Sequence, residues 1–169
     1  WVSSETVKEN LTIPEYVSFP ETYRDDIKPF ISPGKKMPVD NATIKEIAET
    51  YKKPDMIETI KSILSFVNKT QTYDRDRITL LMGGQLNTTS LMNFVNDPLE
   101  SLQTNKSFCC ERALLAATLM RAAGVPAKTF TSADLKTWIQ VWLGEDIGWV
   151  DAEVLSERAQ HLFPRSLST

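Results

Sequence analysis

The chain has 169 residues, of which 41% are hydrophobic and 24% are charged, and its formal net charge at pH 7 is −3. This length and composition fit one globular domain with a substantial core. Because the basic residues are scattered and the longest apolar run is residues 113–117, we expect no nucleic-acid footprint, no anionic-membrane surface and no membrane-spanning segment.

Residues 1–39 contain five of the nine prolines and are predicted to form an extended arm. Proline lacks the amide donor and fixes φ, so long regular elements are not expected there. We expect this arm to cross the domain that follows, residues 40–169, which ends in a short tail, or to link that domain to something upstream. The chain begins with Trp1 rather than Met, which indicates a processed product or part of a longer protein.

Helix starts are predicted at three places, with the capping residues Asp40 or Asn41, Asp55 with Glu58, and Asp97 followed by Pro98. Apolar residues at helical spacing follow the first two of these starts. Residues 68–76 lack such spacing and are expected to form a loop. Gly83 and Gly84 are expected to end any helix near Leu80.

The stretch from Ser107 to Lys128, SFCCERALLAATLMRAAGVPAK, is apolar nearly all round in its central part. This pattern predicts a helix that is buried on most of its faces. Gly124 is expected to end the helix, and Pro126 prevents its continuation. Cys109 therefore lies at the start of the helix, directly after a loop.

After this helix the apolar residues follow the period of a strand. Residues 125–131 are a predicted strand, and residues 137–143 alternate, with Ile139, Val141 and Leu143 on one face. Residues 144–148 are predicted to form a hairpin loop, and residues 149–155 are predicted to be the partner strand. Helices, then a central helix, then antiparallel strands indicate an α+β fold with the central helix packed on the sheet.

Cys109 and Cys110 are the only cysteines, and adjacent residues of one helix cannot form a disulfide without distorting the backbone. The positive end of a helix dipole favours the thiolate, so the position of Cys109 predicts a lowered pKa. The first amides of the helix can also hold an oxyanion. Cys110 points about 100° further round the helix and is expected to pack. The alternative is that both cysteines are small buried hydrophobic residues.

Residues 97–128, followed by a strand with two tryptophans and the sequence GWVDAE, resemble the transglutaminase-like family of papain-like cysteine enzymes. In that family a cysteine opens the central helix, an acidic residue follows two places later and an alanine four places later. Glu111 and Ala113 match those two positions, and residues 121–128 match the family's Arg-Ala-x-Gly-hydrophobic-Pro-Ala-basic ending. The resemblance covers residues 41–155. It implies a papain-like α+β fold, Cys109 in the nucleophile's position, and thiol acyl-transfer chemistry on amide bonds.

The resemblance also implies a histidine two residues before the first strand tryptophan and an aspartate four residues after the Gly-Trp tryptophan. Here these positions hold Lys136 and Glu153, and Asp151 lies two residues too early. Glutamate retains the carboxylate that orients a base, but a lysine ammonium does not exchange protons at neutral pH as imidazole does. The only histidine, His161, lies in the C-terminal tail and would have to fold back to reach Cys109.

These departures predict a degenerate copy of the family domain, without enzymatic activity, that serves recognition or architecture in a larger protein. The alternative is an active cysteine peptidase or acyltransferase that uses Cys109 as nucleophile and an unusual base, Lys136 or His161. One histidine and an adjacent cysteine pair do not make a zinc tetrahedron, and no phosphate-binding glycine loop is present. We therefore expect no metal and no cofactor, and a protein or peptide as partner.

Two further patterns bear on surroundings and partners. Trp138, Trp142 and Trp149 are predicted to pack between the sheet and the central helix, or alternatively to form an aromatic wall for a peptide or sugar. Asn-x-Ser/Thr triplets begin at Asn10, Asn41, Asn68, Asn87 and Asn105. Five triplets predict a glycosylated, extracellular or cell-surface protein, unless these asparagines simply occupy turns and helix caps.

Overall fold

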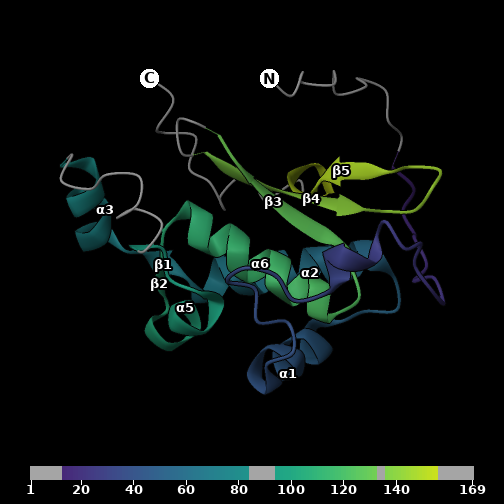
Figure 1. Ribbon diagram of the computed structural model, residues 1–169, viewed down its shortest axis with the longest axis horizontal. Helices are drawn as coiled ribbons and strands as arrows, with labels where there is room; N and C mark the ends of the chain where they lie inside the picture. The colour runs from purple at the N-terminus through teal and green to yellow at the C-terminus, as the bar shows by residue number, and fades with distance from the viewer. Residues whose placement is uncertain (1–12, 84–93, 133–135, 156–169) are drawn as a thin grey trace.

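The computed structural model of this chain describes residues 13–83, 94–132 and 136–155 (Figure 1). The helices are α1 (Ala42–Tyr51), α2 (Met56–Thr70), α3 (Arg75–Met82), α5 (Pro98–Thr104) and α6 (Cys109–Ala122), with 3-10 helices η1 (Lys28–Ile31) and η2 (Ala152–Leu155). The strands are β1 (Thr72–Tyr73), β2 (Lys106–Ser107), β3 (Ala127–Thr131), β4 (Thr137–Trp142) and β5 (Trp149–Asp151). The fold is α+β, as predicted.

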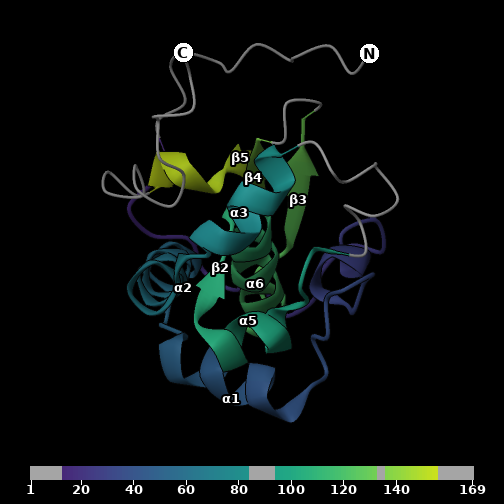
Figure 2. The same cartoon turned by 90° about the vertical axis from the view of Figure 1, so that its left-hand side faces the viewer.

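Helix α6 lies at the centre of the domain, with the β3-β4-β5 sheet on one side and helices α1, α2 and α5 packed against its other sides (Figures 1 and 2). Its apolar residues are buried nearly all round, including Leu115, Leu119 and Met120. The prediction that Cys109 opens this buried helix is confirmed. In the part of the chain described above, no helix has both the length and the apolar character needed to cross a bilayer.

The sheet is antiparallel throughout. Residue Ala127 of β3 pairs with Val141 of β4, and Val141 pairs in turn with Val150 of β5. Alternation along β4 turns Ile139, Val141 and the following Leu143 toward the core, where their exposed fractions are 2%, 0% and 2%. The predicted hairpin and its inward face are therefore confirmed.

Two local predictions are wrong. Residues 68–76 do not form one loop, because α2 continues to Thr70, β1 pairs in parallel with β2, and α3 begins at Arg75. The two-residue strand depends on a partner 34 positions later, Thr72 opposite Lys106, which local spacing does not reveal. The strand from Trp149 ends at Asp151, so Glu153 lies in the 3-10 helix η2 and not in a strand.

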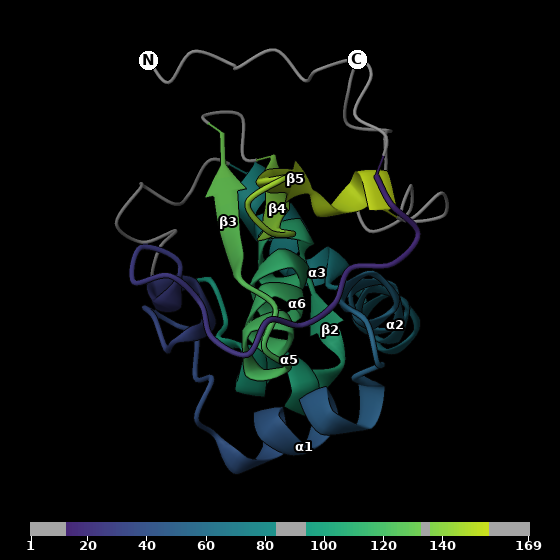
Figure 3. The same cartoon turned by 90° about the vertical axis from the view of Figure 1, so that its right-hand side faces the viewer.

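The described part of the N-terminal arm crosses the domain near the C-terminal end of α6 (Figure 3). Val17 accepts a hydrogen bond from the amide of Met56 (2.8 Å), and the Tyr23 hydroxyl donates to the carbonyl of Gly124 (2.5 Å). Arg121 on α6 donates to the carbonyl of Ser32 (2.9 Å). Apart from η1, the described part of the arm contains only short turns, isolated bridges and irregular backbone, which fits its many prolines. The domain boundary at residue 39 stays a prediction.

Candidate functional site

Cys109 is the first residue of α6 and follows directly on β2. The short β1-β2 pair places this helix start beside the chain that leaves α2, because Tyr73 lies opposite Ser107 in the parallel register. Phe108 is the N-cap residue in an extended conformation and offers no polar side chain. The capping contact comes from inside the helix instead, where the Glu111 carboxylate accepts the Phe108 amide proton (3.1 Å).

Glu111 is completely buried, and its carboxylate accepts four hydrogen bonds. Two come from the Arg77 guanidinium (2.5 and 3.0 Å), and two come from the amides of Phe108 (3.1 Å) and Asn96 (2.8 Å). A buried carboxylate is tolerated when it is paired and fully hydrogen-bonded in this way. Glu111, the acid that the family pattern places after Cys109, therefore holds two backbone segments together, one at Asn96 and one at Phe108.

Arg77 connects this carboxylate to helix α3. Its guanidinium lies 4.7 Å from the ring centre of Phe94 and 4.3 Å from that of Phe108, and it donates to the Phe94 carbonyl. Asp74, which caps the start of α3 by accepting the Arg77 amide, also lies 3.7 Å from the guanidinium. Sequence reasoning missed Arg77, whose only signal was the Asp-Arg-Asp-Arg run at residues 74–77.

Arg112 is the second buried cation of the region, with an exposed fraction of 4%. Its guanidinium lies 4.3 Å from the ring centre of Tyr73, and one nitrogen donates to the Gln71 carbonyl (2.6 Å). Burial lowers the pKa of Arg112, while the proximity of Tyr73 and Cys109 raises it. The sequence analysis did not single out this residue either, although its spacing of three from Cys109 puts both on one helix face.

The expected lowering of the Cys109 pKa is wrong. Burial of the half-exposed thiol raises its pKa, and the backbone amides of the first helical turn and the charge of Arg112 offset this only in part. Burial likewise raises the pKa of Cys110, to about 12. The start of α6 thus supplies the expected backbone amides, but burial raises the pKa of Cys109 by more than these amides lower it.

Lys136 and Glu153 occur at the end of the sheet that lies toward the start of α6. The antiparallel register makes Thr131 and Thr137 the last pair of β3 and β4, and Lys136 directly precedes it. Strand β5 runs back toward the same end and leads into Glu153. Both side chains are exposed. The convergence of these two side chains with Cys109 stays a prediction, and His161 lies outside the described residues.

The tryptophans do not pack against α6, so that part of the prediction is wrong. Strand alternation puts Trp138 and Trp142 on the opposite face of β4 from Val141. Trp138 stacks on Phe130 (5.8 Å between ring centres), and Trp142 meets the ring of Tyr23 from the arm (6.0 Å). The outer face of the sheet is therefore aromatic.

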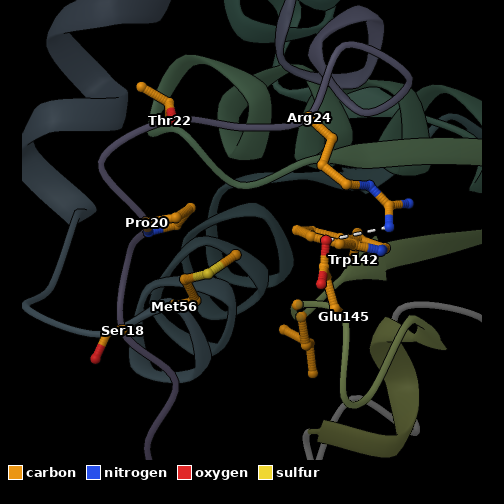
Figure 4. Close-up of a pocket in the computed structure, with 9 residues that line it drawn as sticks. Ser18, Pro20, Thr22, Arg24, Met56, Trp142 and Glu145 are labelled. Carbon is orange, nitrogen blue, oxygen red and sulfur yellow. Dashed lines mark hydrogen bonds and ion pairs between the residues drawn. The ribbon is translucent and has the colours of Figure 1, made fainter.

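A shallow cavity of about 270 Å³ lies between the arm and the β4-β5 hairpin, away from Cys109 (Figure 4). Two residues that line it, Arg24 and Glu145, form an ion pair (3.3 Å). The Arg24 guanidinium lies 5.6 Å from the ring centre of Trp142. Cys109, Lys136 and Glu153 do not line it, whereas Trp142, one of the three tryptophans considered for an aromatic wall, does. For metals, the described residues contain no group of three or more His, Cys, Asp or Glu side chains placed to hold an ion.

Comparison with known proteins agrees with this geometry. Residues 42–154 match the family model described as the transglutaminase-like superfamily. A solved structure from Cytophaga hutchinsonii, named "Putative Cysteine Protease", is similar in fold, with a TM-score of 0.56 and 16% identity. The similarity covers 84% of this chain but only 44% of that protein. No curated protein matches the chain.

Proposed function

The chain belongs to the transglutaminase-like superfamily, and from this premise we propose that the domain is non-catalytic and acts as a recognition or structural module of a larger, exported protein. The main support is the residue at the histidine position of the family pattern. A general base must accept and return a proton near neutral pH, which imidazole does. A lysine ammonium does so only when it is stripped of water, and the Lys136 side chain is exposed.

The state of the thiol is a second support. A cysteine enzyme attacks with the thiolate, which a neighbouring imidazole or a positive environment stabilises. Burial raises the pKa of Cys109, so the neutral thiol predominates near neutral pH. An exposed lysine ammonium and a protonated thiol leave the attack on the amide without a base that accepts the thiol proton.

The alternative function is an active cysteine peptidase or acyltransferase. The fold similarity to a protein named as a cysteine protease and the position of Cys109 at the start of α6 favour it. It requires Lys136 or His161 to act as the base. The two functions differ in one measurable property, which is Cys109-dependent turnover of amide bonds.

The test compares four proteins: the unmodified chain, Cys109→Ala, Lys136→His, and the Lys136→His variant that also carries Cys109→Ala. We expect no Cys109-dependent hydrolysis or cross-linking of a peptide library by the unmodified chain. Restoring imidazole is expected to raise Cys109-dependent turnover by about 10²–10⁴-fold, the usual contribution of general acid–base catalysis. Comparable turnover by the unmodified chain would refute the non-catalytic proposal.

The proposed export is supported by the five Asn-x-Ser/Thr triplets. Asn41 and Asn105 also have structural roles, as the N-cap of α1 and as the left-handed C-cap of α5, with φ of 52°. Expression in a glycosylating secretory host, followed by glycosidase treatment, tests the proposal. Secreted protein without any mass shift at these sites would refute the glycosylation part of it.

A further inference from the structure

Arg112 has an unusual position relative to the thiol. It lies three residues after Cys109 on the same face of α6. Helical side chains incline toward the N-terminus, so its guanidinium covers the turn that begins with Cys109. Stacking on Tyr73 and donation to the Gln71 carbonyl hold it there.

This cation lacks a paired carboxylate within the described ranges. Glu111 and Asp74, the nearby acidic residues, both engage Arg77, at 2.5 and 3.7 Å, and none of the ion pairs of the described residues includes Arg112. The Arg112 Nε, which is buried, has no hydrogen-bond partner among these residues. A buried cation without an anion is unfavourable, and no ion pair among these residues neutralises the charge of Arg112.

The same interior holds further polar atoms that lack partners among the described residues. They are the Gln71 Oε1, the Ser101 Oγ and the Ser107 Oγ, on residues that are all at least nine-tenths buried. Gln71 links two of these residues, since its Nε2 donates to the Ser101 carbonyl (3.2 Å) and its own carbonyl accepts from Arg112. Ser107 lies opposite Tyr73, the residue on which Arg112 stacks. The interior around Gln71 and the β1-β2 pair therefore contains polar atoms that the described residues do not satisfy.

The charges that act on Cys109 do not cancel. Arg112 and Glu111 both influence it, and the effect of Arg112 is the larger. The bidentate ion pair with Arg77 further neutralises Glu111. Because Arg112 is buried, dissolved salt screens its charge much less than that of a surface cation. The half-exposed thiol thus lies in a locally positive environment.

We propose that Arg112 makes the Cys109 site selective for anionic ligands, namely peptide segments or acyl groups that carry a carboxylate close to the atoms meeting the thiol. This inference rests on the proposed function only in placing recognition at Cys109. It needs no general base, so it is tested separately from amide turnover.

The experiment uses the full chain with Cys110→Ala, so that one thiol reports. Its alkylation rates with iodoacetate and iodoacetamide are measured by intact mass at one mildly alkaline pH. Both reagents form the same S–C bond and release iodide, but only iodoacetate carries a negative charge. We expect the iodoacetate-to-iodoacetamide rate ratio to exceed that of the urea-unfolded chain by about tenfold, as for one nearby, partly screened charge.

Three variants identify the cation. Arg112→Gln is expected to lower the ratio to that of the unfolded chain, and Arg112→Lys to retain most of it. Lys28→Gln, which removes an exposed lysine near the opposite end of α6, is expected to leave it unchanged. A ratio equal to that of the unfolded chain in the starting protein, or one that Arg112→Gln leaves unchanged, overturns the proposal.

If Arg112→Gln fails to fold, the salt dependence of the starting protein decides. A ratio that persists at high salt supports a buried cation, whereas a fall to the unfolded value overturns it. Amide turnover by the unmodified chain would refute the non-catalytic proposal without altering this ratio.

Discussion

Replacing Glu111 by glutamine is expected to be among the most destabilising conservative changes in this protein. The carboxylate is completely buried and accepts four hydrogen bonds, two of them from Arg77. Glutamine keeps the shape but puts an NH₂ group against at least one donor, and it leaves the buried part of the guanidinium without its anion. Breaking a buried ion pair by removing one partner costs about 3–5 kcal/mol.

Glu100→Gln is the matched control. Glu100 occupies the same third position of helix α5 and accepts the Asp97 amide (2.8 Å) in a capping box, but its side chain is exposed. We expect its replacement to cost only about 0.5–1 kcal/mol, because water and the amide oxygen can substitute. The difference between the two variants isolates burial and the Arg77 ion pair from capping itself.

The free energy of unfolding is measured by urea titration with circular dichroism. A loss of about 3–5 kcal/mol is a large part of a typical total stability of about 5–15 kcal/mol. It corresponds to a fall in Tm of roughly 6–20 °C for a chain of this size. If Glu111→Gln destabilises no more than Glu100→Gln does, the network around Glu111 does not support the fold as argued here.

Three further outcomes are expected. Burial raises the pKa of Tyr23 from 10.0 to about 12, so between these pH values the folded state keeps a proton that the unfolded state loses. The free energy of unfolding should therefore fall as pH rises from 10 to 12, and fall less in Tyr23→Phe, which a pH titration of the unfolding midpoint checks. Because burial raises the pKa of Cys110 to about 12, this thiol should react with a thiol-directed reagent far more slowly at pH 8 than an unfolded cysteine does. The rate is measured in Cys109→Ala, where Cys110 is the remaining thiol, and equal rates in the folded and the urea-unfolded chain would contradict its burial. Arg121→Met should free the arm from α6 by removing the hydrogen bonds to the Pro29 and Ser32 carbonyls, and faster proteolytic cleavage within residues 13–39, with the remaining domain intact, checks it.

Local features of the chain were predictable because they depend on neighbours in sequence. Asn41, Asp55 and Asp97 cap the helices that begin after them, since a short polar side chain reaches the free amides two or three residues on. The hairpin was predictable from the period-2 alternation of residues 137–143 and from the following loop, which begins and ends with glycine. The start of α6 at Cys109 followed from an apolar run ended by Gly124, whose φ is 90°.

The sequence by itself determined the α+β class, through local periodicity, and the family, through the resemblance of residues 41–155 to it. The assignment of Cys109, Lys136 and Glu153 to the family's catalytic positions stays a prediction. Tertiary structure alone decided the environment of the thiol. The β1-β2 pair, the pairing of Glu111 with Arg77 and the stacking of Arg112 on Tyr73 join residues 34 to 39 positions apart. Burial then reversed the pKa shift that the helix start had predicted for Cys109, because loss of water at a site depends on every segment that covers it.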